Sequence, residues 1–163
     1  MWSFIRAAEP RGFIGAFLDG ELVGYAIFVP SLRRVQREAL HSGAVLRWAW
    51  AVLRGGFALR LSAIPRIVAN KALFLRSAGA HRGKGDAQLL NIAVLPAYQG
   101  KGVATALVRA GLDAMREMRV LEVRLEVRPW NAGAVHVYRK TGWREAGRTR
   151  DVEGEWLVMV ANP

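Results

Sequence analysis

The sequence has no cysteine among its 163 residues. This absence excludes a disulfide framework, a thiolate metal site and a cysteine nucleophile, so any catalysis must use other groups. No stretch of 18 residues is free of charged side chains, which excludes a membrane-spanning helix. The first ten residues lack the basic start and apolar run of a secretory signal, so we expect a cytoplasmic location. The three histidines, His41, His81 and His136, show no metal-ligand spacing, and we expect no metal site.

Negative charge is nearly absent from one long segment. Residues 31–85 hold eleven Lys and Arg residues against a single acid, Glu38, whereas the other 108 residues hold 13 basic and 12 acidic groups. A chain of this length with 52% apolar residues has material for one ordinary core. We therefore expect one domain over 1–163, with a basic insert at about 31–85 and a core at about 86–163.

Apolar patterning predicts alternating strands and helices. Apolar segments flank Asp19-Gly20, a pair that tolerates positive φ, and predict a hairpin. From Ser31, a plausible N-cap, to about Arg76 the period is helical, with breaks expected at Gly55-Gly56 and Pro65. The remaining segments follow in chain order: hairpin strands 13–18 and 21–29, strand 87–94, helix about 102–119, strand 120–127, helix 131–141, and tail strands of about 143–149 and 155–160.

The loop Gln99-Gly100-Lys101-Gly102-Val103-Ala104 lies between the predicted strand 87–94 and the helix that follows. The first N–H groups of a helix lack partners and the helix dipole favours negative charge there, so this arrangement can bind a phosphate. The loop lacks both the third glycine of the dinucleotide fingerprint and the Gly-Lys-Ser/Thr ending of a P-loop. By itself it could equally be a glycine-rich turn without a ligand.

Two blocks of sequence resemble one known family. The segment from Asn91 to Leu107 closely resembles the acetyl-CoA signature Arg/Gln-x-x-Gly-x-Gly/Ala of the GCN5-related N-acetyltransferase (GNAT) superfamily. The segment from Leu125 to Trp143 looks like the strand, loop and helix on the other side of the cofactor, and is most similar to ribosomal-protein alanine N-acetyltransferases. The resemblance implies an α/β fold, with a mixed, mostly antiparallel twisted sheet flanked by helices. The basic helical insert falls between the second and third strands.

The resemblance also implies which residues hold acetyl-CoA. The main chain at Ile92, Ala93 and Val94 would bind the thioester and the pantetheine arm like an added strand, with the N–H of Val94 polarising the thioester carbonyl. The expected pyrophosphate cradle comprises Gln99, Gly100, Lys101, Gly102, Val103, Ala104 and the hydroxyl of Thr105. Asn131 would bond the pantetheine, and Tyr138 would lie near the sulfur.

Direct transfer needs a neutral amine and a proton for the departing thiolate. Tyr138 fits the role of the general acid that supplies this proton. The alternative is a core tyrosine whose hydroxyl has its hydrogen bond satisfied. The likeness to the alanine N-acetyltransferases suggests Glu126 as the base, acting directly or through water. Glu122, four residues away on the same strand face, is a competitor, and one or both glutamates could be solvated strand residues.

The acceptor side departs from the family. Members normally begin with a strand and helices that form one wall of the acceptor site, whereas about a dozen residues precede the first hairpin strand here. Either the start is truncated, or residues 31–85 replace the wall, or a second subunit completes it in a homodimer. The insert mixes arginines with large apolar residues, which suits an anionic membrane surface at the inner face of the membrane, RNA, or simple packing on the domain.

The sequence therefore predicts an N-acetyltransferase that moves an acetyl group from acetyl-CoA to a primary amine, either a protein N-terminus or a small molecule. One alternative is a noncatalytic acyl-CoA-binding module held at a membrane by its insert. The other is an acetyltransferase acting on aminoacyl-tRNA.

Overall fold

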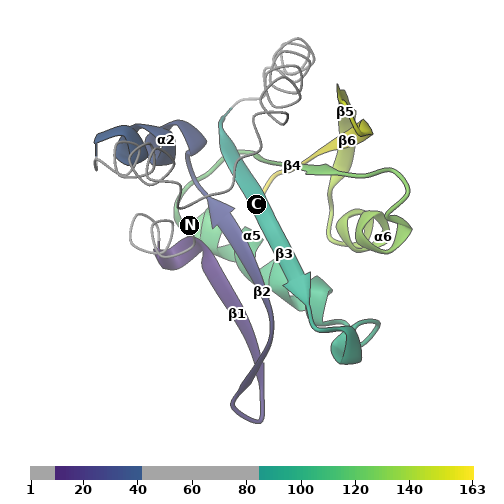
Figure 1. Ribbon diagram of the computed structural model, residues 1–163. Helices are drawn as coiled ribbons and strands as arrows, with labels where there is room; N and C mark the ends of the chain where they lie inside the picture. Colours follow the sequence, from purple (N-terminus) through teal and green to yellow (C-terminus); the bar gives the residue numbers. More distant parts are fainter. Residues whose placement is uncertain (1–9, 42–84) are drawn as a thin grey trace, which may run out of the picture.

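The computed structural model describes residues 10–41 and 85–163 (Figure 1). Strands and helices alternate along this part of the chain. In order, the elements are η1 (Pro10–Gly12), β1 (Phe13–Leu18), β2 (Glu21–Val29), α2 (Leu32–His41), β3 (Ala87–Val94), η3 (Pro96–Tyr98), α5 (Val103–Glu117), β4 (Val123–Val127), α6 (Ala132–Lys140), β5 (Arg144–Asp151) and β6 (Gly154–Ala161).

The described strands form one six-stranded sheet in the order β1-β2-β3-β4-β6-β5. Neighbouring strands are antiparallel except β3 and β4, which are parallel. This sheet, with helices against it, confirms the predicted fold class. The predicted insert lies outside the described residues beyond α2, and the single-domain arrangement stays a prediction.

Local sequence signals explain the first elements. Asp19 (φ 51°) and Gly20 (φ 84°) both have the positive φ that a tight hairpin needs, and the strands on either side have the predicted bounds. Ser31 caps α2 as predicted, because its Oγ accepts the N–H of Arg34 at 3.1 Å. Asp86 accepts the Ser31 hydroxyl at 3.0 Å and the Arg33 N–H at 2.8 Å, which fixes the start of α2 to the start of β3.

The helix of residues 103–117 confirms the predicted one, but its buried face differs from the face expected. Three- and four-residue spacing in the sequence predicts one apolar face with Val103, Ala106, Leu107, Ala110 and Ala114, but Ala106 and Ala110 are exposed. The stripe that packs on the sheet is instead formed by larger side chains at three- and four-residue spacing, with Gly111 among them: Leu107, Val108, Gly111, Leu112 and Met115.

The strand predicted over 120–127 starts three residues late. Arg119 adopts a left-handed φ of 58°, and the N–H of Val120 donates to the carbonyl of Met115 at 3.0 Å. Residues 119 and 120 therefore terminate α5 instead of starting β4. The helix over 131–141 and both tail strands agree with prediction to within two residues.

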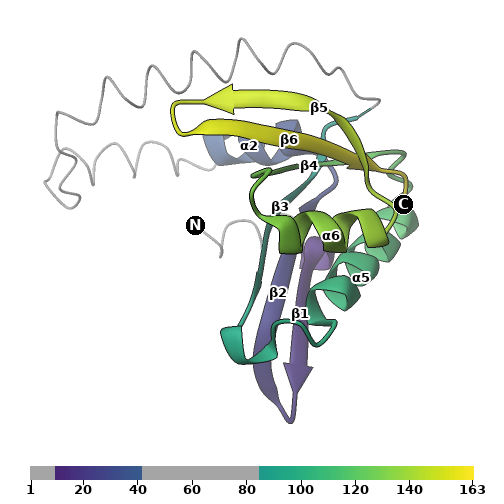
Figure 2. The same ribbon diagram turned by 90° about the vertical axis from the view of Figure 1, so that its right-hand side faces the viewer.

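The two faces of the sheet bury different cores. On one face α5 and α6 lie next to each other, as Figure 2 shows, over the apolar side chains of β2, β3, β4 and β6. On the other face α2 covers Ile27 and Val29 of β2 through Val35. Among residues 10–41 and 85–163, no helix is long and apolar enough to cross a membrane.

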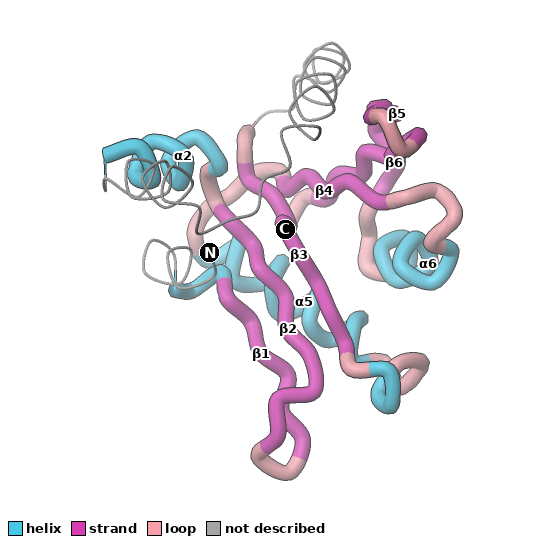
Figure 3. Tube along the Cα trace, in the orientation of Figure 1, coloured by secondary structure: helices cyan, strands magenta, loops and turns pink. Residues whose placement is uncertain are grey.

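The sheet splits between its two parallel strands. β3 and β4 pair only at Ala87 with Val123 and at Gln88 with Arg124. Beyond these residues the strands run apart (Figure 3), β3 toward η3 and β4 alongside β6. A bulge at Leu90 accompanies the split, since Phe28 faces Leu89 while Ile27 faces Asn91. The result is a gap with the open edge of β3 on one side.

Candidate active site

A cavity of about 520 Å³ lies beside this gap. Three elements supply its walls: the C-terminal half of β3, the N-terminal turn of α5 with the loop before it, and one face of α6. The lining residues are Ile92, Ala93, Val94, Tyr98, Gln99, Gly100, Gly102, Val103, Ala104, Thr105, Asn131, Gly133, Ala134, His136, Val137, Tyr138 and Lys140. The structure thus brings together residues that are widely separated in sequence.

The main chain of β3 presents hydrogen-bonding groups to the gap. Leu95 donates its N–H to the carbonyl of Val23 in β2 at 2.9 Å. Successive residues of a strand direct their amides to opposite edges, so the N–H groups of Val94 and Ile92 point away from β2, toward the gap. The carbonyl of Val94 accepts the side-chain amide of Gln99 at 3.1 Å, which ties the end of β3 to the glycine loop.

The start of α5 forms an anion site at the other end of the cavity. Gly100 (φ 74°) and Gly102 (φ 85°) take left-handed backbone conformations, and a Cβ at either position would meet no protein atom within 4 Å. The N–H of Ala106 makes a helical bond to Gly102, so the amides of Val103, Ala104 and Thr105 precede the first helical bond. These three residues line the cavity, and an anion there would meet free N–H groups and the positive end of the helix dipole.

Lys101 is the member of the predicted cradle that does not line the cavity. Its ammonium group lies 5.2 Å from the ring centroid of Tyr98, a cation–π distance. Its neighbours on both sides still belong to the wall. The cradle is therefore built by the glycines and the helix start, and the lysine side chain turns elsewhere.

Helix α6 supplies more of the wall than the sequence prediction named. Asn131 caps the helix, since its Oδ1 accepts the N–H of Ala134 at 3.2 Å, and it also lines the cavity. The wall residues on this helix that the prediction did not name are Gly133, Ala134, His136, Val137 and Lys140. All but Ala134 recur at the three- and four-residue spacing of one helix face, which could have found them from the sequence.

Tyr138 is buried at the wall of the cavity, with its ring 5.8 Å from that of Trp143. Burial raises the pKa of Tyr138 to about 12, because the phenolate loses hydration. The hydroxyl therefore keeps its proton throughout the neutral range. It can donate a hydrogen bond to a group bound in the cavity.

Glu126 lies on the opposite side of the sheet from the cavity. Val123, Leu125 and Val127 of β4 pack against the helices, so the alternating residue Glu126 points to the other face and is absent from the cavity wall. Its Oε1 accepts from Nη2 of Arg124 at 2.5 Å. The part of β4 that carries this carboxylate lies beyond the last residue paired with β3, alongside the gap.

Glu122, the competing carboxylate, precedes β4 instead of lying within it. Its side chain is largely buried, and its Oε2 accepts from Nη2 of Arg144 at 3.4 Å. This position is at the closed end of the gap, before the paired residues Val123 and Arg124. Glu126 lies beyond them, where the strands have separated.

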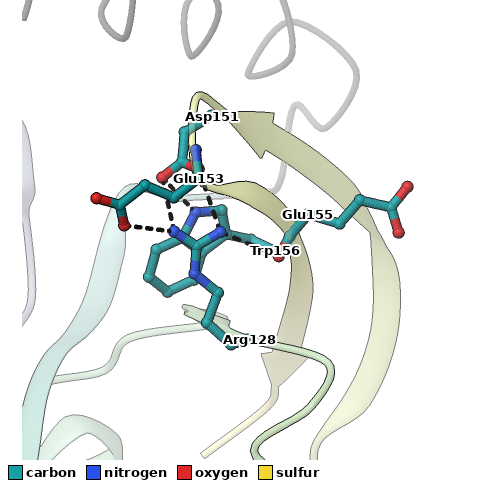
Figure 4. Close-up of polar contacts among 5 residues, drawn as sticks. All are labelled: Arg128, Asp151, Glu153, Glu155 and Trp156. Atoms are coloured by element: carbon teal, nitrogen blue, oxygen red, sulfur yellow. Dashed lines mark hydrogen bonds and ion pairs between the residues drawn. The ribbon is translucent and has the colours of Figure 1, made fainter. Parts of the chain in front are cut away.

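A charged cluster joins the end of β4 to the β5–β6 turn on the same face as Glu126. Figure 4 shows the Arg128 guanidinium stacked on the Trp156 ring, 3.8 Å from its centroid, with carboxylates around it. Arg128 donates to both oxygens of Asp151, at 3.1 and 3.0 Å, and to Glu153 at 3.1 Å. Burial alone would raise the pKa of Asp151, but hydrogen bonds from Trp156 and Arg128 and the attraction of Arg128 lower it overall.

No local sequence pattern indicates this cluster, because its members come from separate strands. Nor do residues 10–41 and 85–163 contain any group of three or more His, Asp or Glu side chains that could hold a metal ion. In this part of the chain the candidate chemistry therefore rests on the cavity, Tyr138 and the carboxylates of β4.

The cavity thus combines the open edge of a split parallel strand pair, a helix N-terminus suited to an anion and a second helix along its wall. Residues 1–143 match the Acetyltransferase (GNAT) family. The chain belongs to this family, whose members use acetyl-CoA as cosubstrate, and this confirms the family and enzyme class predicted from the sequence.

Individual relatives agree with that assignment. The chain is 38% identical over 78 residues to an N-alpha-acetyltransferase of Sulfurisphaera tokodaii, covering 46% of this chain and 47% of the relative. It is 41% identical over 61 residues to the [ribosomal protein bS18]-alanine N-acetyltransferase of Escherichia coli, covering 37% of this chain and 41% of the relative. The chain thus spans less than half the length of these curated relatives.

The fold is also similar to that of Ard1 from Thermoplasma volcanium. The TM-score is 0.61 at 18% identity, over 99% of this chain and 76% of that one. Similarity at this identity supports the fold alone.

Proposed function

We propose that the protein is an acetyl-CoA-dependent N-acetyltransferase that moves the acetyl group directly to a primary amine. The observation that carries this proposal is the single cavity that combines an open strand edge, an anion-binding helix start and a protonated tyrosine. The open strand edge would bind the amide-containing arm of the cofactor, the helix start would bind its pyrophosphate, and the tyrosine would lie near its sulfur.

The cofactor would lie along the cavity from α5 to the gap. Its pyrophosphate would accept from the main chain between Gly100 and Thr105, where the glycines leave room for close approach. Its pantetheine arm would pair with the open edge of β3 as an added strand. The side chain of Asn131 borders this path, within reach of the pantetheine amides.

The register of the parallel strands bears on which amide polarises the thioester. Counted from the pair of Gln88 and Arg124, Glu126 lies two residues along β4, whereas Ile92 and Val94 lie four and six residues along β3. The amide of Ile92 is therefore nearer than that of Val94 to the carboxylate that would meet the amine. We assign the thioester carbonyl to the N–H of Ile92 and leave the N–H of Val94 to the pantetheine.

Transfer would occur within the gap. The amine nitrogen attacks the thioester carbon from the Glu126 side, and the carbon–sulfur bond breaks on the Tyr138 side. Glu126 takes the amine proton, directly or through water, and Tyr138 donates to the departing thiolate. Glu126 is a better base than Glu122 on position, because Glu122 lies at the closed end of the gap beside Arg144.

The acceptor and any macromolecular partners are less closely defined than the cofactor. A protein N-terminus is the first class to examine, since two relatives carry that activity in their names. The predicted membrane, RNA and homodimer contacts of residues 31–85, the single-domain arrangement and the cytoplasmic location all remain predictions. Most of the insert lies outside the described residues.

Thiol release from acetyl-CoA across an amine panel tests the proposed function. The panel should include peptides with free N-termini, small amines and aminoacyl-tRNA, each compared with its N-blocked form. We expect acceptor-dependent thiol release and an acetylated product. Tight acetyl-CoA binding with no turnover on any acceptor would instead favour the noncatalytic acyl-CoA-binding module.

A further inference from the structure

The face of β4 that points away from the helices carries an alternating row of charges: Arg124, Glu126 and Arg128. Residues two apart on a strand share a face and lie roughly 7 Å apart, within reach of an arginine side chain. Arg128 is already engaged by Asp151, Glu153 and the Trp156 ring. Arg124 is thus the cation of this row that can serve Glu126.

The contact between Arg124 and Glu126 is close and partly shielded from water. Nη2 of Arg124 donates to Oε1 of Glu126, and the two side chains are only 25% and 15% exposed. A charge-assisted hydrogen bond in such a setting is stronger and more directional than an exposed ion pair. It restricts a carboxylate that would otherwise sample several rotamers.

The described strand neighbours of this pair offer no substitute for Arg124. Glu126 faces Val158 across the β4–β6 ladder, and Arg124 faces Val160, so β6 presents aliphatic side chains there. On the other side the gap has opened, since the last β3 partner is Gln88 opposite Arg124. Within the described part of the chain, Arg124 is the group that holds the Glu126 side chain.

The hydrogen bond also gives the two oxygens of the Glu126 carboxylate different roles. Oε1 of Glu126 is bound to Arg124, and among residues 10–41 and 85–163 no hydrogen bond engages Oε2. An ionised carboxylate can accept at both oxygens at once. With respect to the described residues, Oε2 can therefore accept from an amine or an ordered water while Oε1 fixes the group in place.

We propose that Arg124 is a positioning residue, which orients the Glu126 carboxylate toward the gap for the incoming amine. This inference rests on the proposed function, since it assumes that Glu126 is the base. Arg124 contacts neither cofactor nor thioester in this arrangement. It acts only through Glu126.

Four proteins test the proposal: wild type, Arg124→Gln, Glu126→Gln and the double variant. We expect Arg124→Gln to lower kcat/KM for the amine by about tenfold, the scale of losing one oriented charge-assisted hydrogen bond. The KM for acetyl-CoA should stay unchanged, because the cavity walls do not include Arg124. In the Glu126→Gln background the same Arg124 change should cost nothing further.

Two further variants separate positioning from a structural role. Arg124→Lys keeps a charge on a flexible stem and should recover part of the lost rate. Arg116→Gln is the matched control, because Arg116 forms an exposed ion pair with Asp113 on α5, which packs on the face of β4 opposite Glu126. It should leave both kinetic constants at their wild-type values.

The outcomes distinguish failure of this inference from failure of the proposed function on which it rests. An inactive wild type would remove the proposed function. An active wild type in which Arg124→Gln costs the same with or without Glu126, or in which Arg124→Lys is no better than Arg124→Gln, would overturn the inference alone. If Arg124→Gln does not fold, as judged by its thermal transition, the Lys variant in both backgrounds supplies the same cycle.

Discussion

Under the proposed function, the two sides of the gap between β3 and β4 would recognise their partners by different means, the helix side the cofactor and the β4 side the acceptor. On the cofactor side, the walls are main-chain amides, glycines and one helix start, with Tyr138 as the buried polar side chain. On the acceptor side, the surface of β4 and the β5–β6 turn is built of charged side chains bound to one another. The cofactor side therefore presents main-chain groups in fixed positions to a ligand that does not vary. The acceptor side depends on contacts between side chains of residues that are distant in the sequence.

This difference explains why the cofactor is easier to assign than the acceptor. A main-chain site requires glycines and small residues at fixed positions, whatever else changes. A side-chain site can be rebuilt by substitutions on several strands. Each of the following substitutions alters one side of the gap, and the measurement shows whether the properties of the other side also change.

The largest effect on stability should come from Arg128→Gln on the acceptor side. The change leaves Asp151 and the stacked Trp156 ring without their cation in a nearly buried site, and we expect a loss of about 3 kcal/mol in the free energy of unfolding. Urea unfolding measures it. Arg148→Gln is the matched control, because Arg148 also pairs with two carboxylates but is 57% exposed, and it should cost under about 1 kcal/mol. Equal losses in the two variants would contradict a special role for the cluster.

The Tyr138→Phe change should lower kcat by roughly a hundredfold, the usual scale for a lost proton donor, while acetyl-CoA binds as before. The ring and its contact with Trp143 are retained. Rapid-quench or steady-state thiol release measures the rate, and calorimetry measures binding. A wild-type rate would show that Tyr138 is only a core residue.

The same variant carries a pH signature. Burial raises the pKa of Tyr138 from 10 in the unfolded chain to about 12, so the folded state holds this proton more tightly. The associated stability is complete below pH 10 and is lost as the pH rises from 10 to 12. Tyr138→Phe should therefore lose less stability than wild type over that interval in urea unfolding. Parallel curves would contradict the burial of the hydroxyl.

Gly102→Ala should weaken acetyl-CoA binding by about tenfold, because the new Cβ meets no protein atom within 4 Å, would lie beside the proposed pyrophosphate cradle and strains a left-handed residue. Gly20→Ala is a close match, with φ 84° against 85° and likewise no protein atom within 4 Å of the added Cβ. Both variants should lose about 1 kcal/mol of stability, and only Gly102→Ala should lose affinity. Loss of affinity in both would mean that backbone strain, not the cradle, governs binding.

The smallest effect should follow Asn131→Ala. Removal of the α6 cap should cost about 1 kcal/mol of stability, since the N–H of Ala134 loses its partner. The acetyl-CoA affinity should fall a few-fold as well, because Asn131 lines the cavity. Asn131→Asp retains the cap and should restore stability, so the two consequences can be separated by thermal unfolding and calorimetry.

The cofactor side could be read from the sequence because its determinants are local. The turn at Asp19-Gly20, the strand ending at Val94 and the glycines before α5 each follow from neighbouring residues, and the structure places them as expected. Asn131 and Tyr138 reach the same cavity from one short helix.

The acceptor side could not be read in this way. The pairing of Arg128 with Asp151 joins residues 23 positions apart through the β4–β6–β5 ladder, which no local pattern encodes. The bond from Arg124 to Glu126 is local, but its meaning depends on where β3 and β4 separate. The buried face of α5 also could not be predicted from residue spacing alone, because it depends on side-chain size. The alanines at the expected positions do not pack on the sheet, and larger neighbouring side chains do.

Titration of acetyl-CoA into the isotope-labelled protein, followed by amide NMR, tests the central claim most directly. The account predicts saturable binding, with the largest shifts at the amides of Ile92, Val94 and the residues from Gly100 to Thr105, and little change at the Gly20 turn. Absence of saturable binding, or shifts confined to residues away from the β3 edge and the α5 start, would contradict it.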